Sequence, residues 1–199
     1  GLTKEEVGAL FWPDCSPDQL KSRFKNAVYR LRSALGRDVI VFFDDLYRFD
    51  RSIDYDYDVE SFNKWLKEAY RSRDAALRII ALQHAVDLYA GPYLTDVDAS
   101  WASLEREQLR RMYVDAATEL AQLYYEQGEM DRALDCCQRL LAEDPCLEDA
   151  HRLAMRIYAS SGNRAGVARQ YAMCLKYLEE EIAAPPSPLT EELYVMLMQ

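Results

Sequence analysis

A repeat of 34 residues in the second half of the chain restricts its fold more than any other feature. Tyr124 matches Tyr158 at this spacing, and Gly128 matches Gly162. A period of this length with glycine at the same point is typical of helix–turn–helix units. Each such unit buries its apolar face only against the next unit. The repeat therefore predicts stacked helical pairs in this part of the chain.

Helical spacing of apolar residues also continues on both sides of the repeat. Further helices are expected over residues 58–70, 74–89, 98–127 and 190–198. In the second of these, Leu77, Ile80 and His84 are among the residues expected to face inward. The period and pattern of the repeat are those of tetratricopeptide (TPR) units. Residues 53–199 are therefore expected to form one TPR-like, superhelical α-helical domain.

Two short motifs near the amino end predict two successive helices. Thr3-Lys4-Glu5-Glu6 and Ser16-Pro17-Asp18-Gln19 have the form of capping boxes, which begin helices, and Gly36 is suited to end the second helix. Residues 39–43 and 46–49 are rich in β-branched and aromatic side chains, and two aspartates separate them. The sequence predicts a β-hairpin there, in a chain that is otherwise mainly α-helical.

The helix expected over residues 17–35 has an apolar face and a cationic face. At 100° per residue, one arc, which is expected to face a core, carries Leu20, Phe24, Ala27, Val28, Leu31 and Leu35. The opposite face carries short polar side chains, which can reach base edges in the major groove, between cations that can meet both phosphate rims. A solvated basic helix face is the alternative interpretation. The candidate DNA-binding residues are Lys21, Ser22, Lys25, Asn26, Tyr29, Arg30, Arg32 and Arg37, with Arg48 on the hairpin.

The chain has a net charge of −10, which would oppose DNA binding if the charges were evenly distributed. They are not evenly distributed. Residues 1–52 hold nine Lys/Arg and eight Asp/Glu, whereas residues 53–199 hold fifteen and twenty-six. The acidic stretch 50–58 is the expected linker between these parts. Electrostatic screening at physiological salt has a length of ~8–10 Å. A basic patch that touches phosphate is therefore little affected by acids on a separate domain.

The sequence resembles bacterial SARP-like regulators over nearly its whole length. LTKEEVGALFWPD (2–14) and NAVYRLRSALG (26–36) resemble their OmpR/PhoB-type winged helix-turn-helix. YDVESF, LYAGPYL and the Pro-Ser-Pro connector resemble their bacterial transcriptional activator domain. The resemblance implies a partial winged helix-turn-helix domain in residues 1–52, since the family's N-terminal strands and first helix would precede Leu2. It implies the activator domain in residues 53–199.

The resemblance also implies a function, that of a DNA-binding transcriptional activator. Helix 17–35 would enter the major groove of double-stranded DNA. The helical repeats would contact RNA polymerase subunits or another protein, and a homodimer is a further assembly that the family implies. A hypothesis from a different class is a TPR-type interaction adaptor that works through an acidic repeat groove and does not bind DNA.

The residue pattern does not favour an enzyme. His84 and His151 are far apart in the sequence, each within an amphipathic helix, and no glycine-rich phosphate loop, nucleophile elbow or HExxH motif occurs. Five cysteines form no CxxC pair and are expected to be reduced, mostly buried thiols. We expect neither a cofactor nor a metal. No apolar run reaches the ~18–20 residues of a membrane span, and no export signal is seen, which predicts a cytoplasmic protein without membrane contact.

Overall fold

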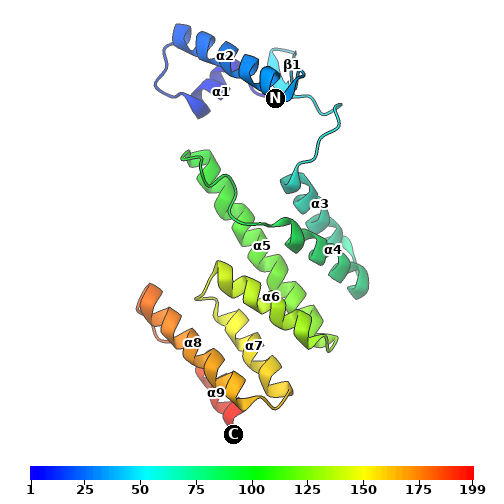
Figure 1. Ribbon diagram of the computed structural model, residues 1–199, viewed down its shortest axis with the longest axis vertical. Coiled ribbons are helices and arrows are strands. Elements are labelled where there is room, and N and C mark those ends of the chain that lie inside the picture. Colours follow the sequence, from blue (N-terminus) through cyan, green and yellow to red (C-terminus); the bar gives the residue numbers. More distant parts are fainter. The chain divides into compact units, whose positions relative to one another are not determined.

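The computed structural model describes residues 1–199 and divides into two compact units (Figure 1). Unit 1 comprises residues 1–57 and 93–107, and unit 2 comprises residues 58–92 and 108–199. The chain is mainly α-helical with one two-stranded hairpin, so the predicted fold class is confirmed. The domain boundary expected between residues 52 and 53 stays a prediction.

Unit 1 contains two complete helices, the hairpin and the start of a longer helix, and both expected capping boxes form. Its elements are α1 (Lys4–Phe11), α2 (Pro17–Leu35), β1 (Ile40–Phe43), β2 (Leu46–Phe49) and the first part of α5 (Ser100–Glu126). The Thr3 hydroxyl accepts from the Glu6 amide at 3.2 Å, and the Glu6 carboxylate accepts from the Thr3 amide at 2.7 Å. Ser16 and Gln19 form the same pair of bonds at the start of α2. Gly36 ends α2 in the left-handed conformation, with φ of 67°.

A buried glycine lets α1 and α2 approach closely. A Cβ atom at Gly8 would lie 2.6 Å from a Leu20 methyl carbon, so a larger residue would push the helices apart. One turn further along α2, the rings of Phe24 and Tyr47 meet edge to face, with 4.5 Å between centroids. These contacts hold the inner face of α2 against α1 and the hairpin.

The apolar arc predicted for α2 is buried only over its first half. Leu20 and Phe24 are each 9% exposed, but Leu31 is 44% and Leu35 55% exposed. The expectation that the whole arc faces a core was therefore wrong for its last turns. Helical spacing shows that these residues share a face, but it does not show how far the elements packed on that face extend.

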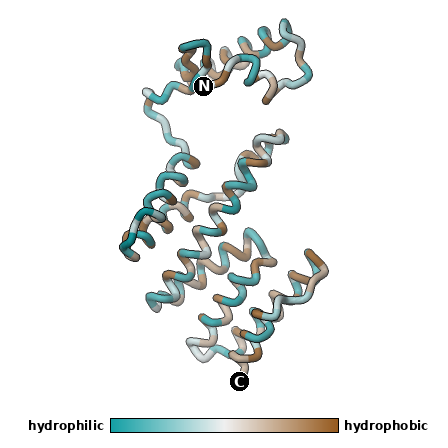
Figure 2. Tube along the Cα trace, turned by 180° about the vertical axis from the view of Figure 1, so that it is seen from behind, coloured by the Kyte–Doolittle hydropathy of each residue, from teal (hydrophilic) through white to brown (hydrophobic).

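Unit 2 is built from helices that follow one another along the chain, and hydropathy alternates along them (Figure 2). Its helices are α3 (Asp58–Arg71), α4 (Ala75–Leu88), the second part of α5 (Ser100–Glu126), α6 (Met130–Glu143), α7 (Glu148–Ser160), α8 (Arg164–Ile182) and α9 (Pro188–Met198). The pair α3–α4 is joined to the following helices by Tyr124, whose hydroxyl donates to Gln83 at 2.7 Å, and by Arg139, which pairs with Asp87 at 3.0 Å.

The turns at the two ends of the 34-residue period are equivalent. The Glu129 amide donates to the Tyr124 carbonyl at 2.9 Å, and the Asn163 amide donates to the Tyr158 carbonyl at the same distance. Gly128 and Gly162 both adopt positive φ, at 80° and 70°. Glycine is needed at both positions because other residues disfavour this conformation. The repeat seen in the sequence therefore has a structural counterpart, while its assignment to the TPR class stays an interpretation.

Helix α4 buries a different face from the one expected. Ile79, Leu82 and Val86 lie in the core, whereas Leu77 is 58% and Ile80 52% exposed. His84 is also exposed and stacks on Trp65, with 4.4 Å between ring centroids. Ala81, also expected inside, is buried, but the expectation was wrong for Leu77, Ile80 and His84. Helix α4 is apolar on nearly every side, so periodicity alone does not identify its buried face.

His151 is fully buried in α7 and has both ring nitrogens hydrogen-bonded. Nε2 lies 2.9 Å from the Pro145 carbonyl oxygen, and Nδ1 lies 2.7 Å from the Gln170 amide nitrogen. The carbonyl can only accept and the amide nitrogen can only donate, so the proton is on Nε2. Burial lowers the pKa of His151. The residue is therefore a neutral structural link between α7, α8 and the preceding turn.

Polar side chains of α7 form hydrogen bonds with residues at the start of α9. Arg152 donates to the buried Thr190 hydroxyl at 2.8 Å and also pairs with Asp149. The Glu148 carboxylate accepts from the Ser187 amide at 2.9 Å and from its hydroxyl at 2.7 Å. These bonds hold the short helix at the end of the stack.

We expect Ala183→Gly to raise the free energy of unfolding of unit 2. Ala183 ends α8 with φ of 50° and ψ of 42°, a left-handed conformation that glycine adopts without the steric cost of a Cβ atom. The gain should be about 0.5–1 kcal/mol. Removing the Cβ atom removes its steric cost, but the greater conformational freedom of glycine in the unfolded chain offsets part of this gain. Urea denaturation measures it. The matched control is Ala184→Gly at the neighbouring position, which lacks positive φ and should lower stability.

Candidate nucleic-acid interface

The polar side of α2 points away from the elements that cover its other side. Ser22, Asn26 and Tyr29 are exposed there, Tyr29 to 66%. They follow one another at helical spacing, so their side chains form one stripe along the helix. We call this stripe, with the cations on its two margins, the outer face of α2.

Three of the predicted DNA-binding cations on the margins of the outer face have no partner within the chain. Lys21, Lys25 and Arg30 are exposed, and none of them forms an ion pair or a side-chain hydrogen bond. Their charges are therefore fully available to an anionic ligand. A polar stripe between free cations is the arrangement that a DNA groove requires, with base edges in the middle and phosphates on both sides.

The two arginines near the end of α2 already have hydrogen-bond partners within the chain. Arg32 donates through Nε and a terminal nitrogen to Asp38, at 2.9 and 2.7 Å. A terminal nitrogen of Arg37 donates to the Asp54 carbonyl at 3.1 Å, which leaves its positive charge uncompensated. Asp38 was not among the sequence-predicted site residues. It reaches Arg32 because the left-handed turn at Gly36 reverses the chain.

We expect Asp38→Asn to raise the affinity for duplex DNA about fivefold at physiological salt. The change removes the carboxylate that holds Arg32, so that one more cation can meet a phosphate and release its counterion. The slope of log affinity against log salt should steepen by about 0.9. Fluorescence anisotropy with a labelled duplex measures both quantities. Arg32→Ala in the same protein should cancel the gain, and a gain that survives it would contradict this role for Asp38.

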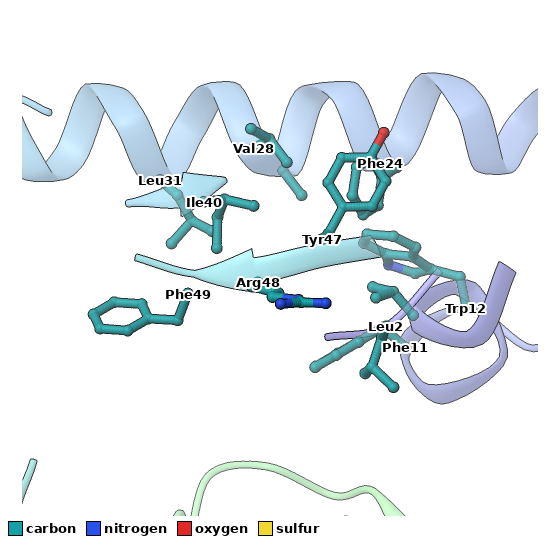
Figure 3. A pocket seen from close by; sticks show the side chains of 12 residues that line it. Leu2, Phe11, Trp12, Phe24, Val28, Leu31, Ile40, Tyr47, Arg48 and Phe49 are labelled. Atoms are coloured by element: carbon teal, nitrogen blue, oxygen red, sulfur yellow. The ribbon is translucent and has the colours of Figure 1, made fainter. Parts of the chain in front are cut away.

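Arg48 does not join the outer face of α2. On β2 it pairs with Val41 and points to the opposite side of the hairpin from Tyr47, which faces α2. Arg48 is one of the residues that line an apolar cavity of about 320 Å³ between α1, α2 and the hairpin, and Figure 3 shows these side chains. The expected role of Arg48 is therefore that of a separate contact through the hairpin.

The tip of the hairpin is poorly suited to phosphate. Asp44 and Asp45 form its turn, both with positive φ, and place two carboxylates at the end. Phe42 and Phe43 beside them are 58% and 69% exposed. Like charges repel, so the tip favours a protein surface rather than a DNA backbone.

Unit 2 carries a groove between α5 and α7 whose lining residues the sequence did not identify. Its volume is about 530 Å³, and Leu123 and Leu147, both partly exposed, provide apolar contact in it. Arg156 and Asp115 also line it and form no ion pair within the chain. Apolar side chains with unpaired charges of both signs are typical of a surface that binds a protein segment. The residues come from two helices that lie far apart in the sequence, so no single stretch indicated them.

Burial disfavours the thiolate form of three cysteines. Burial raises the pKa of Cys136 to about 11, of Cys137 to about 12 and of Cys174 to about 11. Thiols with such pKa values stay protonated at neutral pH, and the thiolate is the reactive form. All five cysteines are free. No group of three or more His, Cys, Asp or Glu side chains is placed to hold a metal ion.

Comparison with protein families identifies the class of the chain. Residues 57–197 match the bacterial transcriptional activator domain, which is well over half of the sequence. The chain belongs to the bacterial transcriptional activator domain family. This family is a regulator domain and not a class of enzyme. The match confirms the part of the sequence interpretation that assigned the helical region to such a domain, whereas the winged-helix assignment and the DNA-binding residues stay predictions.

The fold of this activator-domain protein is also similar to that of a solved structure. Mycobacterium tuberculosis EmbR in complex with a low-affinity phosphopeptide superimposes with a TM-score of 0.70 at 18% sequence identity. The similarity covers 99% of this chain and 54% of the EmbR chain, so the chain spans about half the length of that protein. A search of curated proteins gives no match. No helix of the activator-domain protein is both long and apolar enough to cross a bilayer.

Proposed function

We propose that the chain is the DNA-binding and activating part of a SARP-like transcriptional regulator. The observation that carries the proposal is the outer face of α2, where Ser22, Asn26 and Tyr29 lie between unpaired cations. The family supports it, because a bacterial transcriptional activator domain must be brought to a promoter in order to act there.

In this proposal α2 enters the major groove. Asn26 and Ser22 contact base edges, since an amide can hydrogen-bond two groups of one base. Lys21, Lys25 and Arg30 contact phosphates, and so do Arg32 and Arg37 where their present partners allow it. Arg48 makes a separate backbone contact from the hairpin, away from the acidic tip.

The helical repeats in this proposal engage RNA polymerase or another protein. Unit 2 holds most of the chain's excess of acidic residues, so it does not itself attract DNA. The groove between α5 and α7 offers leucines for burial and Arg156 and Asp115 for orientation, which are the elements that recognition of a protein segment needs.

Binding to duplex DNA as a function of salt tests the proposal. The probe is a labelled pool of random-sequence duplexes, and the readout is fluorescence anisotropy. With about four to six phosphate contacts, affinity should fall ~10²–10³-fold between 50 and 200 mM salt. No binding at 50 mM would instead support the alternative function, an interaction adaptor that works through the repeat groove.

A further inference from the structure

Both ends of the helical stack in unit 2 expose apolar side chains. At the first end, Leu77 and Ile80 of α4 are more than half exposed and lie beside Trp65 of α3. We call these three residues the α4 face. Together with neighbouring polar residues they line a shallow pocket of about 400 Å³.

The last helix of the stack exposes a second apolar surface. Leu189, Val195 and Met196 of α9 are 65%, 57% and 59% exposed. At 100° per residue they fall on a side of α9 that is next to that of Leu193, which packs into the core with Met155. We call these three exposed residues the α9 face.

Apolar surfaces at the ends of a stack have a direct physical consequence. Helical repeats join because each pair covers the apolar side of the next, and stacks stop where the outer side is polar. Neither the α4 face nor the α9 face is polar in this way. Each of them can therefore accept another helical surface.

The charges around the two faces are complementary. Residues 64–78, around the α4 face, hold five Lys/Arg and two Asp/Glu. Residues 179–199 hold five glutamates and neither lysine nor arginine, and two of these glutamates, Glu191 and Glu192, lie on α9 itself. Arg71 lines the α4 pocket and Glu192 lies between Leu189 and Val195 on α9, and neither residue has an ion pair within the chain. An acidic apolar helix thus matches a basic apolar pocket.

We propose that the α9 face of one copy of this chain docks on the α4 face of a second copy, head to tail. The charges exclude the symmetric arrangements. Two α4 faces would bring two basic clusters together, and two α9 faces would bring four α9 glutamates together, since Glu191 and Glu192 lie on this helix in each copy. Both faces lie in unit 2, so the docking is independent of DNA binding.

A head-to-tail contact leaves one face free on each outer copy, so assembly continues beyond the dimer. Association should rise with protein concentration and weaken with added salt, because the charges that steer it are exposed. Light scattering coupled to size-exclusion chromatography should show a mass that increases with loading concentration.

Mixing two variants tests the proposal. Leu77→Glu with Ile80→Glu removes the α4 face and leaves the α9 face intact. Leu189→Lys with Val195→Lys removes the α9 face and leaves the α4 face intact. We expect each variant alone to be monomeric, whereas an equimolar mixture forms a dimer that grows no further, because only one complementary pair of faces remains. Sedimentation velocity measures the masses, and thermal unfolding shows that each variant is folded.

The matched control is Met173→Glu on α8, an exposed apolar residue outside both faces, which should leave the association of the wild type unchanged. Wild-type protein that stays monomeric up to about 100 µM would overturn the proposal. So would a mixture that stays monomeric while the wild type associates. Self-association of the variant that keeps only its α4 face would show symmetric pairing instead, and it too would overturn the head-to-tail arrangement.

Discussion

Replacing Lys25, Asn26 and Arg30 together by alanine lowers the affinity for duplex DNA by about 100-fold or more at physiological salt. Two of these side chains are cations without a partner in the chain, and each of them would neutralise a phosphate. The third is the amide best placed to read a base edge. Anisotropy with a labelled duplex measures the loss, and the slope of log affinity against log salt should become shallower by about two.

A matched variant separates this local effect from the change in net charge. Arg169→Ala with Lys176→Ala also removes two exposed cations, but from α8 in unit 2. We expect it to change DNA affinity less than about twofold, because screening limits the reach of distant charges. All five substituted residues are exposed, so both proteins should unfold at the wild-type temperature. Equal losses in the two variants would mean that binding follows net charge and not the outer face of α2.

Replacing His151 by phenylalanine lowers the free energy of unfolding by about 2–5 kcal/mol. The ring is fully buried, and its loss as a partner leaves the Pro145 carbonyl and the Gln170 amide without their hydrogen bonds. Each buried polar group without a hydrogen-bond partner lowers the free energy of unfolding by about 1–3 kcal/mol. Urea denaturation monitored by circular dichroism measures the change. His84→Phe is the control, because His84 is exposed and should cost little.

The same histidine makes stability depend on pH in a known direction. Burial lowers the pKa of His151 below its usual value of 6.5, so the unfolded chain takes up the proton more readily than the folded chain. The contribution of the neutral ring is complete above pH 6.5 and is lost as the pH falls below it. The difference in unfolding free energy between wild type and His151→Phe should therefore shrink from pH 7.5 to pH 5. A difference that stays constant would contradict a neutral, buried ring.

Features that depend on neighbours in the sequence could be predicted from it. The capping boxes at Thr3 and Ser16 and the glycine at position 36 act within one helical turn, so the sequence contains all the information that they need. The turns at Gly128 and Gly162 are equally local, and their repetition at a fixed period identified stacked helical pairs. The hairpin also formed where two β-prone stretches flank a short polar turn.

Features that depend on contacts between distant elements could not be predicted. Helix α4 is apolar on nearly all sides, and only its packing against other helices decides that Leu82 is buried and Leu77 exposed. The pairing of Arg32 with Asp38 depends on the direction in which the chain leaves Gly36. The close approach at Gly8 depends on where Leu20 crosses α1. In the candidate site, spacing therefore identified the stripe on α2 but not which cations are free.

Chemical protection of a duplex selected from the random pool tests the central claim most directly. Guanine N7 lies in the major groove and adenine N3 in the minor groove, and dimethyl sulfate methylates both. If the outer face of α2 enters the major groove, the wild-type protein protects guanine N7 atoms within its site, and the Lys25, Asn26 and Arg30 triple variant does not. Unprotected guanines beneath a bound wild-type protein, or protection that survives in the triple variant, would contradict the proposed role of α2.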